Sequence, residues 1–179
     1  HVSVGRNAIK TYKLRLAALP QQQKSYEYLS LPYDVKSFTW NEFAREGNFY
    51  SGYSYAAEQI PDSLNAYGVP FRLETRNERN GLACKGNVLK LPAGHTYNRL
   101  YLLAAAAIEG KDVKGTVGVG GHLQEITVPS YTGFIGQWGH TGHTEGYLKE
   151  AEVAYVGTHR HSTQGDHPYE FTYMYKFAI

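Results

Sequence analysis

The sequence predicts an all-β protein, a two-sheet antiparallel β-sandwich of the jelly-roll, galactose-binding-like class. Several short segments alternate apolar and polar residues with a period of two, which is the pattern of half-buried strands. Turns rich in Gly, Pro and Asn separate these segments, and helical character is confined to one short piece, Tyr55 to Ile60, which Pro61 stops. Short strands with frequent turns are typical of sandwiches and jelly rolls.

The predicted strands follow one another along the whole chain. The first is Tyr12 to Leu16, and shorter strand signals follow at 71–74, 88–91, 115–119 and 124–128. Near the C-terminus, apolar residues alternate with glutamates in 150–155. The last strand is the clearest, because five aromatic residues share one face: Tyr169, Phe171, Tyr173, Tyr175 and Phe177.

The segment Leu100 to Ile108 is apolar throughout and therefore shows no periodicity. Its alanines favour a helix, but turns flank it at 91–94 and 110–115. Its length suits a central strand buried on both faces. We therefore predict a strand here.

Length and composition limit the possible functions. At 179 residues the chain fits one domain, 1–179, in which 1–24 is an entering strand and linker from a preceding domain. The formal charge of +2 is spread along the chain and the longest apolar run is short, so we expect neither nucleic acid nor a membrane as partner. The single cysteine, Cys84, excludes an internal disulfide framework. The start at His1, in mid-pattern, indicates excision from a larger protein, for which a secreted or periplasmic location is favoured.

The strongest functional signal is the glycine-rich segment Gly133 to His143 together with the residues that follow it. Five of the eight histidines lie between positions 140 and 167, beside one of only two tryptophans. Trp138 is suited to stacking on the apolar face of a sugar ring. Gln137, His140 and His159 are suited to bonding sugar hydroxyls. These four residues are the candidate carbohydrate site; the alternative is that Trp138 is a core residue closing one end of the sandwich.

Metal sites are the second chemistry to consider. His159 and His161 are two residues apart, so an unbroken strand points both to one face, as many metal sites require. Gly157 can break that register, and the sequence favours imidazoles bonded to loop backbone or ligand hydroxyls, so we expect no metal cofactor. Calcium is the remaining possibility, through oxygen ligands from the loop region 33–62. The candidate ligands are Asp34, Asn48, Glu58 and Asp62, although solvated loop side chains are the default interpretation.

An enzymatic site needs a paired acid and base or an activated nucleophile. The candidates are Asp166 with His167, or Glu145 near the histidines, and neither carries a recognisable motif. The motifs Gly-x-Ser-x-Gly and HExxH are absent, and no helical pattern follows the glycines at 118–121. We therefore predict no catalytic residues in this chain.

Six short motifs between about residue 28 and the C-terminus resemble one known family. They are Leu31–Asp34, Gly52–Pro61, Gly68–Leu73, Ala83–Pro92, Tyr97–Ala106 and Gly133–Trp138. Together they resemble the β-sandwich accessory domain of bacterial α-mannosidases of glycoside hydrolase family 38, and galactose-binding-like jelly rolls of other glycosidases. That family leads us to expect Asp after the Gln-Trp pair. This chain has Gly139 there, which puts any role of that acid in doubt and makes His140 and His143 its possible replacements.

The resemblance implies a non-catalytic module, because the catalytic aspartate of those enzymes belongs to a separate α/β domain that nothing here matches. The leading hypothesis is an accessory or carbohydrate-binding module of a larger glycoside hydrolase, an α-mannosidase. Its partners would be a carbohydrate ligand and the other domains of the parent enzyme. The alternatives are a purely structural scaffold domain, in which Trp138 is buried, and an independent hydrolase that uses a histidine-bound metal.

Overall fold

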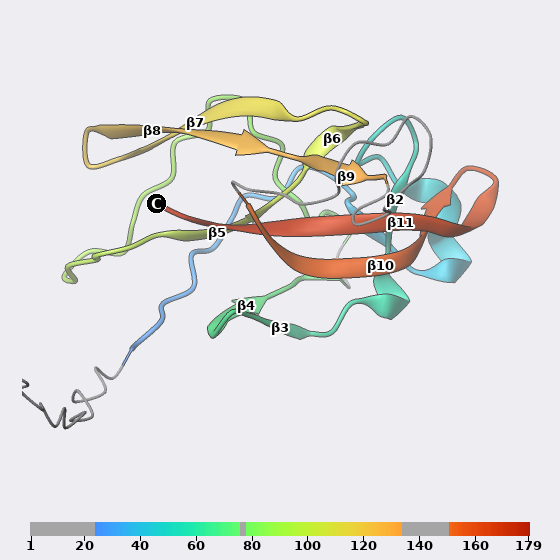
Figure 1. Cartoon of the computed structure of the whole chain (residues 1–179). Coiled ribbons are helices and arrows are strands. Elements are labelled where there is room, and N and C mark those ends of the chain that lie inside the picture. Colours follow the sequence, from blue (N-terminus) through green and yellow to red (C-terminus); the bar gives the residue numbers. More distant parts are fainter. Residues whose placement is uncertain (1–23, 76–77, 134–150) are drawn as a thin grey trace, which may run out of the picture.

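A mixed sheet forms the centre of the molecule. Figure 1 shows a computed structural model of the chain, which describes residues 24–75, 78–133 and 151–179. Within these residues the sheet has seven strands in the order β1-β2-β10-β11-β9-β6, and β5 also pairs with β11. Their bounds are Phe38–Thr39 (β1), Ser54–Ala56 (β2), Tyr101–Ala104 (β5), Ala106–Glu109 (β6), Ser130–Thr132 (β9), Glu152–Ser162 (β10) and Gly165–Ala178 (β11).

Most pairs in this sheet are antiparallel, and the long hairpin β10–β11 forms its middle. The pairs β1–β2 and β6–β9 are parallel. Short 3₁₀ turns, η1 (Asn41–Glu46) and η2 (Ala57–Gln59), flank β2. The chain therefore passes directly from a strand beside β10 into η2, which positions the candidate site described below.

Two hairpins cover opposite faces of the sheet (Figure 1). One consists of β3 (Ser63–Ala66) and β4 (Val69–Arg72), and the other of β7 (Val113–Val119) and β8 (His122–Val128). Leu64 of β3 packs against the core cluster that contains Met174, whereas Ile126 of β8 packs against the cluster that contains Tyr175. Successive residues of a strand point to opposite faces, so β11 is covered on both sides. The protein is an all-β sandwich, as predicted.

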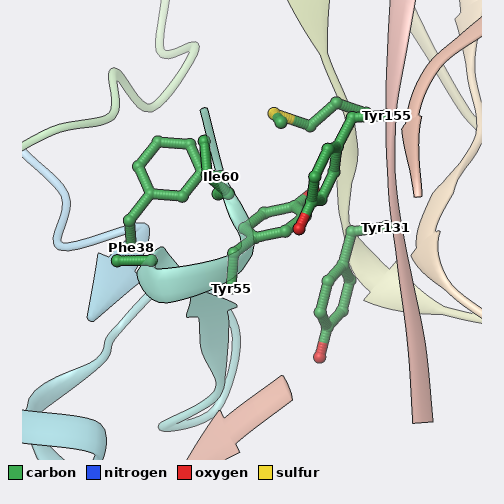
Figure 2. Close-up of a cluster of buried hydrophobic side chains, with 7 residues drawn as sticks. Phe38, Tyr55, Ile60, Tyr131 and Tyr155 are labelled. Atoms are coloured by element: carbon green, nitrogen blue, oxygen red, sulfur yellow. The ribbon is translucent and has the colours of Figure 1, made fainter. Parts of the chain in front are cut away.

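The core is unusually rich in tyrosine. Figure 2 shows one cluster, in which Phe38, Tyr55, Ile60, Tyr131 and Tyr155 pack together. The buried hydroxyl of Tyr55 donates to the carbonyl of Tyr173 at 2.8 Å, which satisfies a polar group that would otherwise be costly to bury. Burial raises the pKa of Tyr55 well above its ordinary value.

The strongest strand predictions are confirmed. The segments 150–155, 115–119, 124–128 and 169–177 lie largely within β10, β7, β8 and β11. One detail of the last strand is wrong: Tyr169 does not share the buried face, because its φ of 65° turns the side chain out and leaves it 80% exposed. The strand signal at 71–74 corresponds to β4, which begins earlier and ends at Arg72.

Three other predictions need correction. Leu100 to Ile108 is two strands, since β5 pairs with β11 and β6 pairs with β9; the uniformly apolar sequence carries no signal for the break at Ala105. The segment 88–91 is not a strand, because Val88 is 92% exposed and has no apolar surface to cover. The piece predicted as helical begins as strand β2, and only Ala57–Gln59 forms a 3₁₀ turn.

The predicted strand Tyr12–Leu16 and the segment 1–23 lie outside the described residues. The helices that the structure describes are η1 and η2, and neither has the length and apolar character needed to cross a membrane.

Candidate metal centre

The end of β10 presents different side chains on its two faces. His159 and His161 lie on one face, and Arg160 and Ser162 lie on the other. The register of the β10–β11 pair shifts between Gly157 and His159. A Cβ atom at Gly157 would lie 2.5 Å from Thr172 Oγ1, so glycine is needed where the strand changes register.

Three ligand-type side chains converge on the histidine face. The Nε2 atoms of His159 and His161 lie 2.9 Å and 3.0 Å from the same oxygen, Oε1 of Glu58. The potential ligand atoms of Glu58, His159 and His161 all lie within 4.8 Å of one another. We call this group the His–Glu cluster. Glu58 reaches it because β2 pairs with β10 through Ser54 and His161, and η2 follows β2 at once.

Side-chain contacts hold the His–Glu cluster in place. His161 is fully buried, and its Nδ1 is hydrogen-bonded to Thr39 Oγ1 at 2.9 Å. Thr39 Oγ1 is in turn 2.6 Å from Ser54 Oγ. Next to Glu58, the side-chain amide of Gln59 makes two hydrogen bonds with Thr158. Its oxygen accepts from the backbone N–H of Thr158, and its nitrogen donates to the Thr158 hydroxyl. The ring of His161 and the turn that carries Glu58 are therefore both fixed.

Asp166 approaches the cluster from the other side of the hairpin. It pairs with His161 in the β10–β11 register, and its Oδ1 lies 3.1 Å from His161 Nε2. In the described part of the chain, the ion pairs of Glu58 and Asp166 are all with histidines. Burial and then the negative charge of Glu58 raise the pKa of the neighbouring Tyr155 to about 12. This face thus combines two carboxylates with cations that exist only when histidine is protonated.

The opposite face carries a permanent cation. The guanidinium of buried Arg160 donates to Glu170, Glu109 and the Tyr131 hydroxyl, each at 2.5 Å. It also lies 3.8 Å from the ring centre of Tyr53, a cation–π distance. Burial lowers the pKa of Arg160, but its hydrogen bonds, above all to Glu109, outweigh that effect and hold the pKa above its ordinary value.

A comparison with known families identifies the domain. The sequence model of the AziU2-like β-sandwich domain matches residues 22–179. The chain belongs to this family. No curated protein matches it. The family match agrees with the predicted β-sandwich, whereas the predicted link to family 38 mannosidases gains no support from it beyond the fold.

Of the residues predicted to bind carbohydrate, the structure of this AziU2-like domain describes only His159. Gln137, Trp138 and His140 lie outside the described residues, as do His143 and Glu145. His159 is partly buried and bonded to Glu58, as stated above. The sequence paired His159 with His161, and the structure brings them together with ring centres 5.4 Å apart.

The predicted calcium ligands do not form one group. Asp34 and Asn48 line a polar cavity of about 270 Å³, whereas Glu58 belongs to the His–Glu cluster. The cavity is also lined by Lys36, Glu46, Glu78 and Arg79, and Lys36 is paired with Glu46.

Asp166 and His167, considered above as a candidate acid and base without a recognisable motif, do not meet, because neighbouring residues of a strand point to opposite faces. Asp166 lies beside His161, whereas the Nε2 atom of His167 lies 2.5 Å from Ser162 Oγ. The sequence reasoning missed Glu58 as a histidine partner, and Thr39 and Asp166 as neighbours of His161. Only the two-residue spacing of the histidines was a usable signal, since Glu58 is 101 residues away from His159.

Proposed function

We propose that this AziU2-like domain binds one divalent transition-metal ion through Glu58, His159 and His161. The observation that carries the proposal is the meeting of two imidazole Nε2 atoms at one carboxylate oxygen, at 2.9 and 3.0 Å. Two ring nitrogens directed at one point can be joined by protons or by a metal ion. The geometry, the charge and the chemistry of the donors favour the ion.

The geometry needs little change to admit a metal. Zinc binds imidazole nitrogen and carboxylate oxygen at about 2.0–2.2 Å, so neighbouring ligand atoms of a tetrahedral site are about 3.3 Å apart. The two distances to Glu58 Oε1 fall short of that value by a few tenths of an ångström. An outward rotation of the Glu58 side chain, which is 30% exposed, lengthens both distances toward the tetrahedral value.

The donor set selects the class of ion. Imidazole nitrogens suit zinc, copper, iron and nickel, whereas calcium and magnesium prefer all-oxygen sites. A metal-ligating histidine usually bonds through its second ring nitrogen to a neighbouring group, which fixes its orientation. His161 has this arrangement, because its Nδ1 faces Thr39 Oγ1 while its Nε2 faces Glu58. A divalent ion also balances the negative charges of Glu58 and Asp166.

The test is a zinc titration of the metal-free chain by calorimetry, with elemental analysis after dialysis. We expect one ion per chain in the wild type and at least a tenfold loss of affinity in Glu58→Gln, His159→Ala and His161→Ala. His122→Ala is the matched control, since His122 is an exposed histidine of β8. Circular dichroism identifies any variant that fails to fold, and Glu58→Gln replaces a part-exposed side chain with one of the same shape. Equal zinc affinity in all five proteins would contradict the proposal.

Carbohydrate binding as part of a larger glycoside hydrolase remains a second proposal, carried by the sequence. It makes a prediction independent of the metal: mannose or α-linked manno-oligosaccharides should quench tryptophan fluorescence in the wild type and not in a folded Trp138→Ala variant. Trp40 provides an internal reference, because its indole N–H donates to the Thr75 carbonyl and its signal should not change. If no sugar changes the tryptophan fluorescence, the carbohydrate proposal is wrong. The structural scaffold hypothesis then stands in its place, beside the proposed metal site.

A further inference from the structure

Resting on the proposed metal site, we infer that the bound ion keeps a coordination position open to solvent beside Asp166. We further infer that Asp166 weakens the binding of anions at this position and leaves the binding of small neutral donors unchanged. Three features of the His–Glu cluster and its surroundings determine what else the ion binds: the number of ligands, the place of Asp166, and the side from which solvent enters.

Three protein ligands leave the ion incomplete. Transition-metal ions of this class take at least four ligands, and sites with three protein ligands fill the remaining position with water or a substrate. The group of mutually close ligand atoms consists of Glu58, His159 and His161, and Asp166 is not a member of it. Its Oδ1 lies 3.1 Å from His161 Nε2, so Asp166 borders the site. We therefore place Asp166 beside the ion and outside the set of its ligands.

Exposure decides where an external ligand enters. The side chain of His161 is fully buried and that of His159 is 19% exposed, so the imidazoles close the inner side of the site. The carboxylates of Glu58 and Asp166 are 30% and 37% exposed, and they form its outer side. An external ligand thus reaches the ion between these two carboxylates, with Asp166 as its nearest unligated neighbour.

Asp166 gives this position its selectivity. A carboxylate next to the open position repels an incoming anion and leaves a neutral donor unaffected. At about 4 Å in a water-like dielectric, one unit charge contributes roughly a fivefold change in affinity. Because Asp166 is more than one-third exposed, we use the water-like value and not the larger interior one.

Cobalt provides the spectroscopic test, since the visible absorption of Co²⁺ reports changes in its ligands. The full chain is loaded with Co²⁺ and titrated separately with azide, an anion, and imidazole, a neutral donor. We expect both to change the spectrum of the wild type. In Asp166→Asn the affinity for azide should rise about fivefold while that for imidazole stays the same. Asp112→Asn, an exposed aspartate before β7, should match the wild type with both ligands.

The outcomes separate the two proposals. If the chain takes up no Co²⁺, the proposed metal site itself is wrong. If Co²⁺ binds but neither azide nor imidazole changes its spectrum, the metal site stands and the open position is refuted. If Asp166→Asn loses Co²⁺ affinity tenfold or more, Asp166 is a ligand and the inference is again overturned.

Discussion

The two faces of β10 hold buried charge in different ways. On one face Arg160 brings a permanent positive charge, which two glutamates and a tyrosine hydroxyl surround. On the other face two imidazoles, which are cationic only when protonated, meet the carboxylates of Glu58 and Asp166. Each face contains two carboxylates, so the difference lies in the cation that compensates them. Arg160 carries a permanent charge, whereas the histidine face gains its positive charge from protons or from a metal ion.

This difference assigns different roles to the two faces. The arginine face is complete as folded, because its cation is always present and donates to two carboxylates and a hydroxyl. The histidine face becomes complete only when it gains protons or a metal ion. We therefore expect the arginine face to determine stability under all ordinary conditions, and the histidine face to make stability and binding depend on what is in solution.

Alkaline pH should have the largest effect on stability, because it ionises buried tyrosines of the core. Burial raises the pKa of Tyr55, Tyr131 and Tyr175, so the folded chain binds more protons than the unfolded chain at high pH. The stability that these tyrosines contribute is fully present below about pH 10. It is lost as the pH rises toward their raised pKa values. The free energy of unfolding should fall by about 1.4 kcal/mol per pH unit for each such tyrosine.

Urea unfolding at pH 8, 10 and 11 measures that loss. The variant Tyr55→Phe should reduce the slope above pH 10 by the contribution of one tyrosine. An unfolding free energy that stays constant from pH 8 to 11 would show that the tyrosines ionise without penalty in the fold, contrary to their burial.

Removing the arginine should produce the next largest effect. Arg160→Met keeps much of the side-chain volume but leaves Glu109, Glu170 and the Tyr131 hydroxyl without their shared donor. Breaking a buried ion pair costs about 3 kcal/mol, and the loss should be visible by thermal unfolding at pH 7. His159→Ala in metal-free buffer is the comparison on the other face and should cost less, because it removes the hydrogen bond to Glu58 whereas Arg160→Met removes bonds to three partners. The reverse order would contradict the assignment of the two faces.

Zinc should stabilise the folded chain through the histidine face alone. A ligand at one hundred times its dissociation constant adds about 2.7 kcal/mol to the free energy of unfolding. For a chain of this size that corresponds to roughly 5–10 °C in Tm. Arg160→Met should keep the zinc-dependent increase in Tm, whereas Glu58→Gln should lose half of it or more. Loss of the increase in both variants would mean that the faces are not independent.

The sequence predicts best what is decided locally. The alternation of Tyr173, Tyr175 and Phe177 identifies β11 because a strand exposes its side chains to two faces in turn. The pairing of His159 and His161 follows from the same rule. The rule fails at Tyr169, where a positive φ reverses the expected direction, and at Ala105, where a uniformly apolar sequence gives no sign that the strand changes partners.

The candidate site depends on contacts that no local pattern reveals. Glu58 meets His159 only because β2 pairs with β10, a contact across about a hundred residues. Thr39 is farther still from His161, at 122 residues. The sequence placed Glu58 among calcium ligands because its neighbours in the chain are loop residues. Which side chains meet is decided by strand order, and strand order in a sandwich is not encoded in the spacing of any one segment.

The smallest of the expected effects concerns the hydroxyl behind the site. Thr39→Val preserves the shape of the side chain but removes the partner of His161 Nδ1, so the imidazole loses the contact that fixes its orientation. Zinc affinity should fall about tenfold without loss of the one-to-one stoichiometry. Thr116→Val on exposed β7 is the matched control and should bind zinc as the wild type does. If Thr39→Val binds zinc with unchanged affinity, the hydrogen bond serves only packing, and the histidine face resembles the arginine face more closely than its charges indicate.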